Sequence, residues 1–299
     1  MKIAERKGLW ASLGILTATV LWGMSFVVVK SSLDFMAQQH ILFYRYLIAF
    51  AAMALVYHRR LKDVTPRVLW ESAVIGGMLF LAQYLQTASC LYTTAGKSAF
   101  ITSFYVIIVP IMSWAAYRKR LDRFGLASVV MALCGLFLLT VGTGETAGSY
   151  SGDLLALGGS VFFAAQIFFI DRYNKRDDAI LLAVFQFGFA VVYSGAYMVL
   201  TCGGDLLPSF TRAAVGSLVY MGVFSTMIAF SLQTVCQKYL PPDLVSLLLS
   251  MEAVFGMLFS VFLLHETLGP GKLLGCALML CAVILSEHKT ARRGERESA

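Results

Sequence analysis

A single carboxylate, Glu252, lies in the middle of a long apolar run, Ser246-Leu-Leu-Leu-Ser-Met-Glu-Ala-Val-Phe. Ionisable groups at membrane depth are costly and usually face a cavity or a partner. A carboxyl group removed from water holds a proton more readily than one in water, so this glutamate is able to exchange a proton or bind a substrate cation. The structural alternative is a buried glutamate that pairs with a neighbouring helix. Its depth in the run favours the functional role.

A second charge, Arg45, lies in the apolar run that contains Phe-Tyr-Arg-Tyr. It is able to attract a carboxylate substrate, or its long side chain can extend toward the outer face of the membrane. We expect the second, structural role. Glu71, at the start of another apolar run, is expected to be solvated.

Neutral polar and aromatic side chains gather on several of the apolar runs. Each alone more often joins two helices than binds a ligand. Together they predict a cavity with polar spots and aromatic walls. The residues expected to line or control it are Trp22, Arg45, Tyr84, Gln86, Tyr105, Gln166, Gln233 and Glu252, and Ser25, Phe26, Gln83 and Phe163 belong to the same polar and aromatic set.

No enzyme motif accompanies these residues. The sequence lacks GxSxG, HExxH, a P-loop and a pair of acids at catalytic spacing, and the missing nucleotide site argues against a primary pump. The six cysteines lie mostly inside apolar runs and show no CxxC or Cys/His spacing. We therefore expect no enzyme activity, no cofactor and no metal site.

The composition places these residues in a membrane protein. The chain has 299 residues, of which 59% are hydrophobic and 14% charged, with a mean hydropathy of +0.75. A soluble domain carries about 25% charged residues. Because a helix needs ~20 apolar residues to cross the hydrocarbon, the long apolar runs predict an all-α integral membrane protein. Short alternating segments typical of a barrel are absent from the sequence.

Ten transmembrane helices account for the apolar runs. The basic residues fall in alternate loops and at both ends, which explains the net charge of +7 without nucleic acid and predicts that both termini are cytoplasmic. The expected helices cover roughly residues 10–29, 41–57, 68–90, 98–117, 124–141, 153–170, 180–200, 213–237, 243–264 and 271–286.

The chain contains an internal duplication. At an offset of 147, Leu85-Gln-Thr falls on Leu232-Gln-Thr, and the register holds over three apolar runs; the first two runs of each half align weakly at an offset of 141. Five helices per copy is an odd number, so the second copy must be inverted, as in many secondary transporters. We expect repeats at 1–143 and 152–288 around a central cavity, joined by a glycine-rich linker at 142–152, and a basic cytoplasmic tail at 289–299.

Pro110 lies inside one of these runs and lacks a backbone donor, which frees a carbonyl and permits a bend. In an inverted repeat such a break is either a hinge for alternating access or a static kink. Met257 occupies the equivalent position of the second copy, so the break is expected in one half only.

The sequence resembles the drug/metabolite transporter superfamily and, within it, the ten-helix EamA family. The resemblance covers nearly the whole chain as two units. It is carried by Leu21-Trp-Gly-Met-Ser-Phe, Phe43-Tyr-Arg-Tyr-Leu-Ile-Ala, the segment from Thr93 to Pro110, and Leu249-Ser-Met-Glu-Ala-Val-Phe continuing to His265-Glu266, with Ala253 where many relatives have proline.

This resemblance implies secondary transport of small metabolites, often export of amino acids or related compounds. We expect alternating access in the cytoplasmic (inner) membrane, with proton coupling through Glu252 as a further hypothesis. The alternatives are an uncoupled uptake facilitator for a small metabolite and a non-transporting membrane receptor or assembly protein. The expected partners are a small-molecule substrate, the lipid bilayer and, under the coupling hypothesis, protons.

Overall fold

The computed structural model describes residues 3–93, 95–118, 123–141, 150–202, 207, 211–264 and 269–297, and within these ranges every regular element is a helix. Eight helical stretches there are long and apolar enough to cross a bilayer, at Lys7–Ser32, Gln38–Val56, Pro66–Tyr92, Lys97–Tyr117, Tyr150–Tyr173, Ala179–Thr201, Arg212–Gln237 and Pro242–Phe259. Two further apolar helices, Arg123–Leu138 and Pro270–Ser286, are shorter. They occupy the fifth and tenth of the expected positions.

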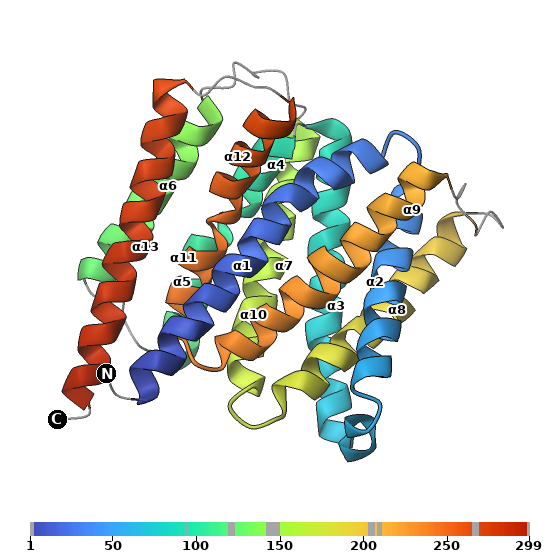
Figure 1. Ribbon diagram of the computed structural model, residues 1–299, viewed down its shortest axis with the longest axis horizontal. Helices are drawn as coiled ribbons and strands as arrows, with labels where there is room; N and C mark the ends of the chain where they lie inside the picture. Colours follow the sequence, from blue (N-terminus) through green and yellow to red (C-terminus); the bar gives the residue numbers. More distant parts are fainter. Residues whose placement is uncertain are drawn as a thin grey trace.

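The helices form one bundle, with both chain termini at the same end (Figure 1). We call this the terminal end. The elements are α1 (Ile3–Ser32), α2 (Gln38–Val56), η1 (Arg60–Asp63), α3 (Pro66–Tyr92), α4 (Ala95–Thr102), α5 (Tyr105–Tyr117), α6 (Arg123–Val141), α7 (Tyr150–Tyr173), α8 (Ala179–Thr201), α9 (Arg212–Val219), the π-helical η2 (Tyr220–Ile228), α10 (Ala229–Gln237), α11 (Pro242–Leu249), α12 (Glu252–Leu264) and α13 (Pro270–Glu297).

The two halves of the chain interlock instead of lying side by side. Helix α1 packs on α10 and α12 of the second half, and α7 packs on α3 and α5 of the first. Helices α2 and α8 pack together, as do α6 and α13. The core therefore consists largely of contacts between segments that are far apart in the sequence.

Helix boundaries follow the two sequence offsets. Helices α1 and α7 end 141 residues apart, at Ser32 and Tyr173, and α5 and α12 begin 147 residues apart, at Tyr105 and Glu252. The turn that follows α1 lies at the end opposite the termini, whereas the turn that follows α7 lies at the terminal end (Figure 1). The equivalent helices α1 and α7 thus run in opposite directions.

The fourth and ninth spans are both interrupted. In the fourth, Phe104 N bonds to Ile101 O and Val106 N to Ser103 O, three residues back instead of four. The ninth span repeats this pattern 147 residues later, at 248–253. Ser103 and Ser250, buried at the two breaks, each bond through Oγ to a carbonyl of the preceding turn, a contact that bends helices.

This observation corrects the expectation of a break in one half only. Helix α5 continues through the buried Pro110, and the interruption lies before it, at residues 103–104. The serines, which occur in both halves, explain why both spans break.

Glu71 is buried and accepts a hydrogen bond from Arg67, so the expectation that it is solvated is wrong. Helix α13 continues into the predicted tail as far as Glu297. Most of the predicted linker, at 142–149, and the His265-Glu266 pair lie outside the described residues.

Candidate functional site

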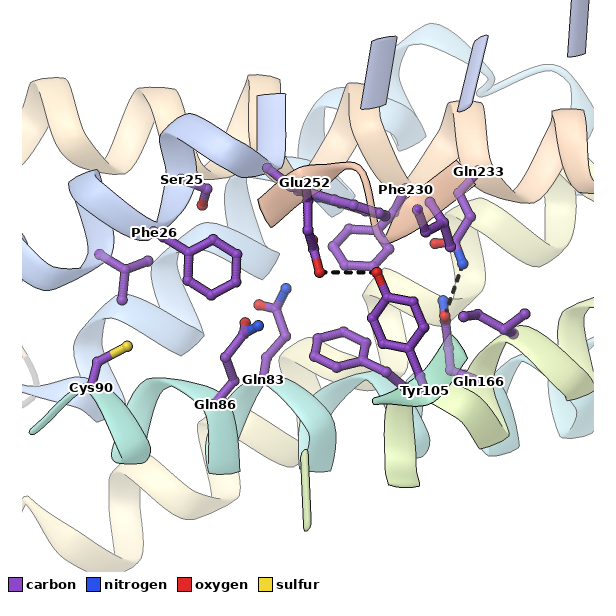
Figure 2. A pocket seen from close by; sticks show the side chains of 15 residues that line it. Ser25, Phe26, Gln83, Gln86, Cys90, Tyr105, Gln166, Phe230, Gln233 and Glu252 are labelled. Atoms are coloured by element: carbon purple, nitrogen blue, oxygen red, sulfur yellow. Dashed lines mark hydrogen bonds between the residues drawn. The ribbon is translucent and has the colours of Figure 1, made fainter. Parts of the chain in front are cut away.

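A pocket lies between the two halves of the bundle, lined from α1, α3, α5, α7, α10, α11 and α12 (Figure 2). The volume of this cavity is about 40 Å³. Its wall combines aromatic rings, amides and one carboxyl group. The lining residues are Trp22, Ser25, Phe26, Val29, Gln83, Gln86, Cys90, Tyr105, Phe163, Gln166, Ile167, Phe230, Gln233, Leu249 and Glu252.

Most of this lining is made of repeat-equivalent pairs. Twelve of the fifteen residues fall into six pairs separated by 141 or 147 positions. Both halves therefore contribute the same positions to one pocket, while the residue types differ in all but one pair. The pairs are Trp22 and Phe163, Ser25 and Gln166, Phe26 and Ile167, Gln83 and Phe230, Gln86 and Gln233, and Tyr105 and Glu252.

Glu252 and Tyr105 meet in the middle of the pocket (Figure 2). Tyr105 Oη donates to Glu252 Oε1 at 3.0 Å, and both residues are buried. Each is the first residue of the helix that resumes after the interruption of its span, Tyr105 in α5 and Glu252 in α12. The interruptions thus place both side chains at the start of a helix inside the bundle.

Amide side chains supply the remaining polar surface. Gln233 Nε2 donates to Gln166 Oε1 at 3.1 Å, which leaves Gln166 Nε2 and Gln233 Oε1 without a partner among the described residues. Gln83 and Gln86 extend into the pocket from α3 (Figure 2). Because a buried polar atom without a partner costs free energy, Gln166 Nε2 and Gln233 Oε1 are suited to bind water or a polar ligand.

The aromatic wall is fixed by the π-helical segment. Trp22 packs on Phe230 with ring centroids 4.5 Å apart, and its indole Nε1 donates to Ser225 O at 2.8 Å. Ser225 belongs to η2, and π-helical turns occur frequently at functional sites. The π segment therefore holds the largest ring of the pocket in place.

Arg45 lies behind the pocket, not in it. Its side chain is buried, so the expectation that it extends to the membrane face is wrong. Its Nε donates to Thr226 Oγ1 at 2.9 Å and its Nη2 to Ser225 Oγ at 3.1 Å. Among the described residues Arg45 forms no salt bridge.

Six of the eight residues selected from the sequence thus line one pocket. Tyr84 lies elsewhere: it is half-buried and packs on Tyr197 of α8 with ring centroids 5.0 Å apart. The sequence did not point to five lining residues, Val29, Cys90, Ile167, Phe230 and Leu249. Two of these positions, Phe230 and Ile167, follow when the two offsets are applied to Gln83 and Phe26, which belong to the wider polar and aromatic set.

The described residues contain no cluster of three or more His, Cys, Asp or Glu side chains suited to a metal ion. The arrangement is a pocket with polar groups and an aromatic wall between the two halves of the bundle.

Comparison with known proteins identifies the chain. The EamA-like transporter family matches residues 9–141 and 150–287, one unit for each half. The chain belongs to the EamA-like transporter family. It is therefore a multi-pass membrane protein with a transport role, and its two family units coincide with the two halves that enclose the pocket.

The relatives of this EamA-like chain agree. An uncharacterized transporter of Archaeoglobus fulgidus is 32% identical over 93% of this chain and 86% of that protein. The uncharacterized transporter YoaV of Bacillus subtilis is 22% identical over 94% and 98%. One solved crystal structure superposes with a TM-score of 0.76 at 20% identity, covering 95% of this chain and 98% of that one, which shows a shared fold.

Proposed function

We propose that this EamA-like protein is a secondary active transporter that exports amino acids or related small metabolites across the cytoplasmic membrane by alternating access. The observation that carries the proposal is the pocket itself. It lies between the halves, is built from equivalent positions of both, and has a buried carboxyl group at its centre. Export and the substrate class follow from the family resemblance.

Alternating access needs two halves that can exchange roles. We propose that the chain crosses the membrane ten times as two inverted repeats, with both termini in the cytoplasm. The opposite directions of α1 and α7 and the matched breaks of the fourth and ninth spans support this arrangement. Helices α6 and α13, which contain the two shorter apolar stretches, are the fifth member of each repeat and pack on each other.

The two ends of the bundle carry different chemistry at equivalent positions. At the terminal end, Arg67 bonds to Glu71 at 3.0 Å and to Asp177 at 3.2 Å; we call these three residues the ionic closure. Its repeat equivalents are Ala214, Leu218 and Met36, which are buried in one apolar cluster and which we call the apolar closure. We propose that the two closures open alternately.

Proton coupling through Glu252 is the second part of the proposal. The pocket side chains around this carboxyl group are Tyr105 and neutral amides, with no basic residue in the lining. A carboxyl group without a cationic partner in a buried site is suited to bind a proton in one state and release it in another. The substrate, which enters from one side of the membrane, and the proton, which enters from the other, would then compete for Glu252.

The test is a thermal-shift screen of the purified protein against single amino acids and other metabolites. A compound that binds the folded state raises the melting temperature. Each compound that does so is then loaded into proteoliposomes, and its flux is measured with and without a pH gradient. We expect flux that the gradient accelerates; shifts without flux for every such compound would contradict a transport role in favour of binding alone.

A further inference from the structure

Three buried groups form a hydrogen-bonded chain that ends at the pocket wall. Arg45 Nη2 donates to Ser225 Oγ at 3.1 Å, and Ser225 Oγ donates to Ser25 Oγ at 2.9 Å. Arg45 is 2% exposed, Ser225 0% and Ser25 7%. Ser25 lines the pocket, so a cation behind the wall is linked to the wall's surface by two hydroxyl groups.

The direction of the bonds fixes what Ser25 offers to a ligand. A serine hydroxyl has one proton and two acceptor lone pairs. Because the guanidinium of Arg45 has only donors, Ser225 Oγ accepts from it. Ser225 then donates its own hydroxyl proton to Ser25 Oγ. Ser25 therefore accepts within the wall, and its proton has no acceptor among the described residues. The Ser25 hydroxyl is therefore able to donate to a ligand in the pocket, and the positive charge of Arg45 lies behind it.

Glu252 provides a hydrogen-bond acceptor at another point of the pocket wall. Its carboxyl group is an acceptor whether it meets a cation or a neutral donor, and Figure 2 shows Ser25 and Glu252 as separate groups on the pocket wall. Aromatic rings of Phe26 and Phe230 cover the surface around them. Besides its amide side chains, the pocket thus has a hydroxyl donor at Ser25, a carboxyl acceptor at Glu252 and an apolar wall.

We propose that Ser25 is the contact for a carboxylate of the transported compound, and that Arg45 is a positioning residue that acts on it through Ser225 without touching the ligand. This inference rests on the proposed function, because it takes the pocket to be the transport site. It assigns Arg45 to substrate recognition from behind the wall. It also gives a role to a buried arginine that has no carboxylate partner among the described residues.

Charge-selective thiol labelling tests the chain. In the Ser25→Cys variant, position 25 is labelled with the anionic sulfonatoethyl or the cationic trimethylammonioethyl methanethiosulfonate, and peptide mass spectrometry separates it from the native cysteines. We expect the anionic reagent to react faster, with a ratio of rates that falls roughly tenfold when Arg45→Gln is added, because a nearby unit charge is removed. Arg45→Lys is expected to keep most of the ratio.

Two matched controls separate charge from structural damage. Cys90 lines the same pocket, and its ratio is expected to stay unchanged in every variant. Should Arg45→Gln not fold, Ser225→Ala is expected to lower the ratio at position 25 and Ser225→Thr, which keeps the hydroxyl, to preserve it. A ratio at position 25 that is the same in all folded variants overturns the inference alone. No labelling at either position overturns the water-accessible pocket, and with it the proposed function.

A pair of similar compounds tests the carboxylate. We expect 4-methylpentanoate to slow labelling at position 25, and 3-methylbutylamine, which replaces the carboxylate by an ammonium group, to slow it less. Protection by the amine alone, or by neither compound, overturns the assignment of a carboxylate to Ser25.

Discussion

Tyr105 donates a hydrogen bond to Glu252 from the equivalent position of the other repeat, 147 residues earlier in the chain. A contact between equivalent positions lies on the axis that relates two repeats. Under the proposed inverted arrangement it is shared equally by both halves and is able to persist while the ends of the bundle open and close. Glu252, the only acid of the pocket lining, would then lie near this axis and remain in the pocket in both states of the proposed transport cycle.

Glu252→Gln is expected to abolish acceleration of flux by a pH gradient. The amide keeps the size of the side chain but cannot release a proton, so coupling is lost while exchange of substrate across the membrane continues. Gradient-driven flux and counterflow in the same proteoliposomes measure the two activities. Acceleration equal to that of the native protein would refute coupling through this residue.

Tyr105→Phe is expected to destabilise the protein by about 1–3 kcal/mol, because it leaves a buried carboxyl oxygen without its donor. Denaturant unfolding in detergent measures the loss. The control is Tyr239→Phe, since Tyr239 is half exposed and lies outside the pocket lining. Combined with Glu252→Gln, the loss should be smaller than the sum of the two single losses; strict additivity would show that the two groups do not interact.

Gly23→Ala is expected to destabilise the contact between α1 and α12 by about 1–3 kcal/mol, because the space there is already filled. A Cβ at Gly23 would lie 2.7 Å from Gly256 N, a backbone atom that cannot move aside cheaply. Gly8→Ala on the same helix is the control, since nothing lies within 4 Å of its Cβ position. Melting temperatures that fall equally for both variants would argue against this close packing.

Arg67→Ala is expected to open the terminal end of the bundle more often. Arg67 is half exposed, so we expect a shift of about 1 kcal/mol, roughly fivefold in the population open at that end. The reporter is Ile167→Cys, a pocket position near the end of α7 that lies at the terminal end, and the rate at which it is labelled by an impermeant maleimide added from the side of the termini is measured. Arg60→Ala, which removes an exposed pair at 3.4 Å, should change the rate less than twofold. Equal rates in the two variants would show that Arg67 does not hold this end closed.

The sequence predicted the helices well because lipid leaves few alternatives. An apolar run long enough to cross the bilayer must satisfy its backbone internally, and a helix does so. The first and sixth helices were expected to end at residues 29 and 170; they end at Ser32 and Tyr173, which keeps the offset of 141. Eight of the expected spans meet the criterion of length and hydropathy, and the two shorter helices lie at the expected places.

The site was harder to predict, since it depends on contacts between distant segments. Periodicity does not show that Ser225 and Thr226, 180 residues away, receive the guanidinium of Arg45, and so the arginine was expected at the membrane face. The break of the fourth span was expected at Pro110, and that of the ninth was missed, because proline was taken as the only signal. The serines at 103 and 250 carried it, and their repetition at an offset of 147 was visible in the sequence.

The ionic and apolar closures respond to different physical variables. Added electrolyte screens the partly exposed pairs of Arg67 and leaves the cluster around Leu218 unaffected. Cooling acts mainly on the apolar closure, because the stabilisation gained by burying apolar surface weakens at lower temperature. Under the proposed alternation, the direction in which the pocket faces depends on the balance of two unlike contacts, and salt and temperature are expected to shift that balance independently.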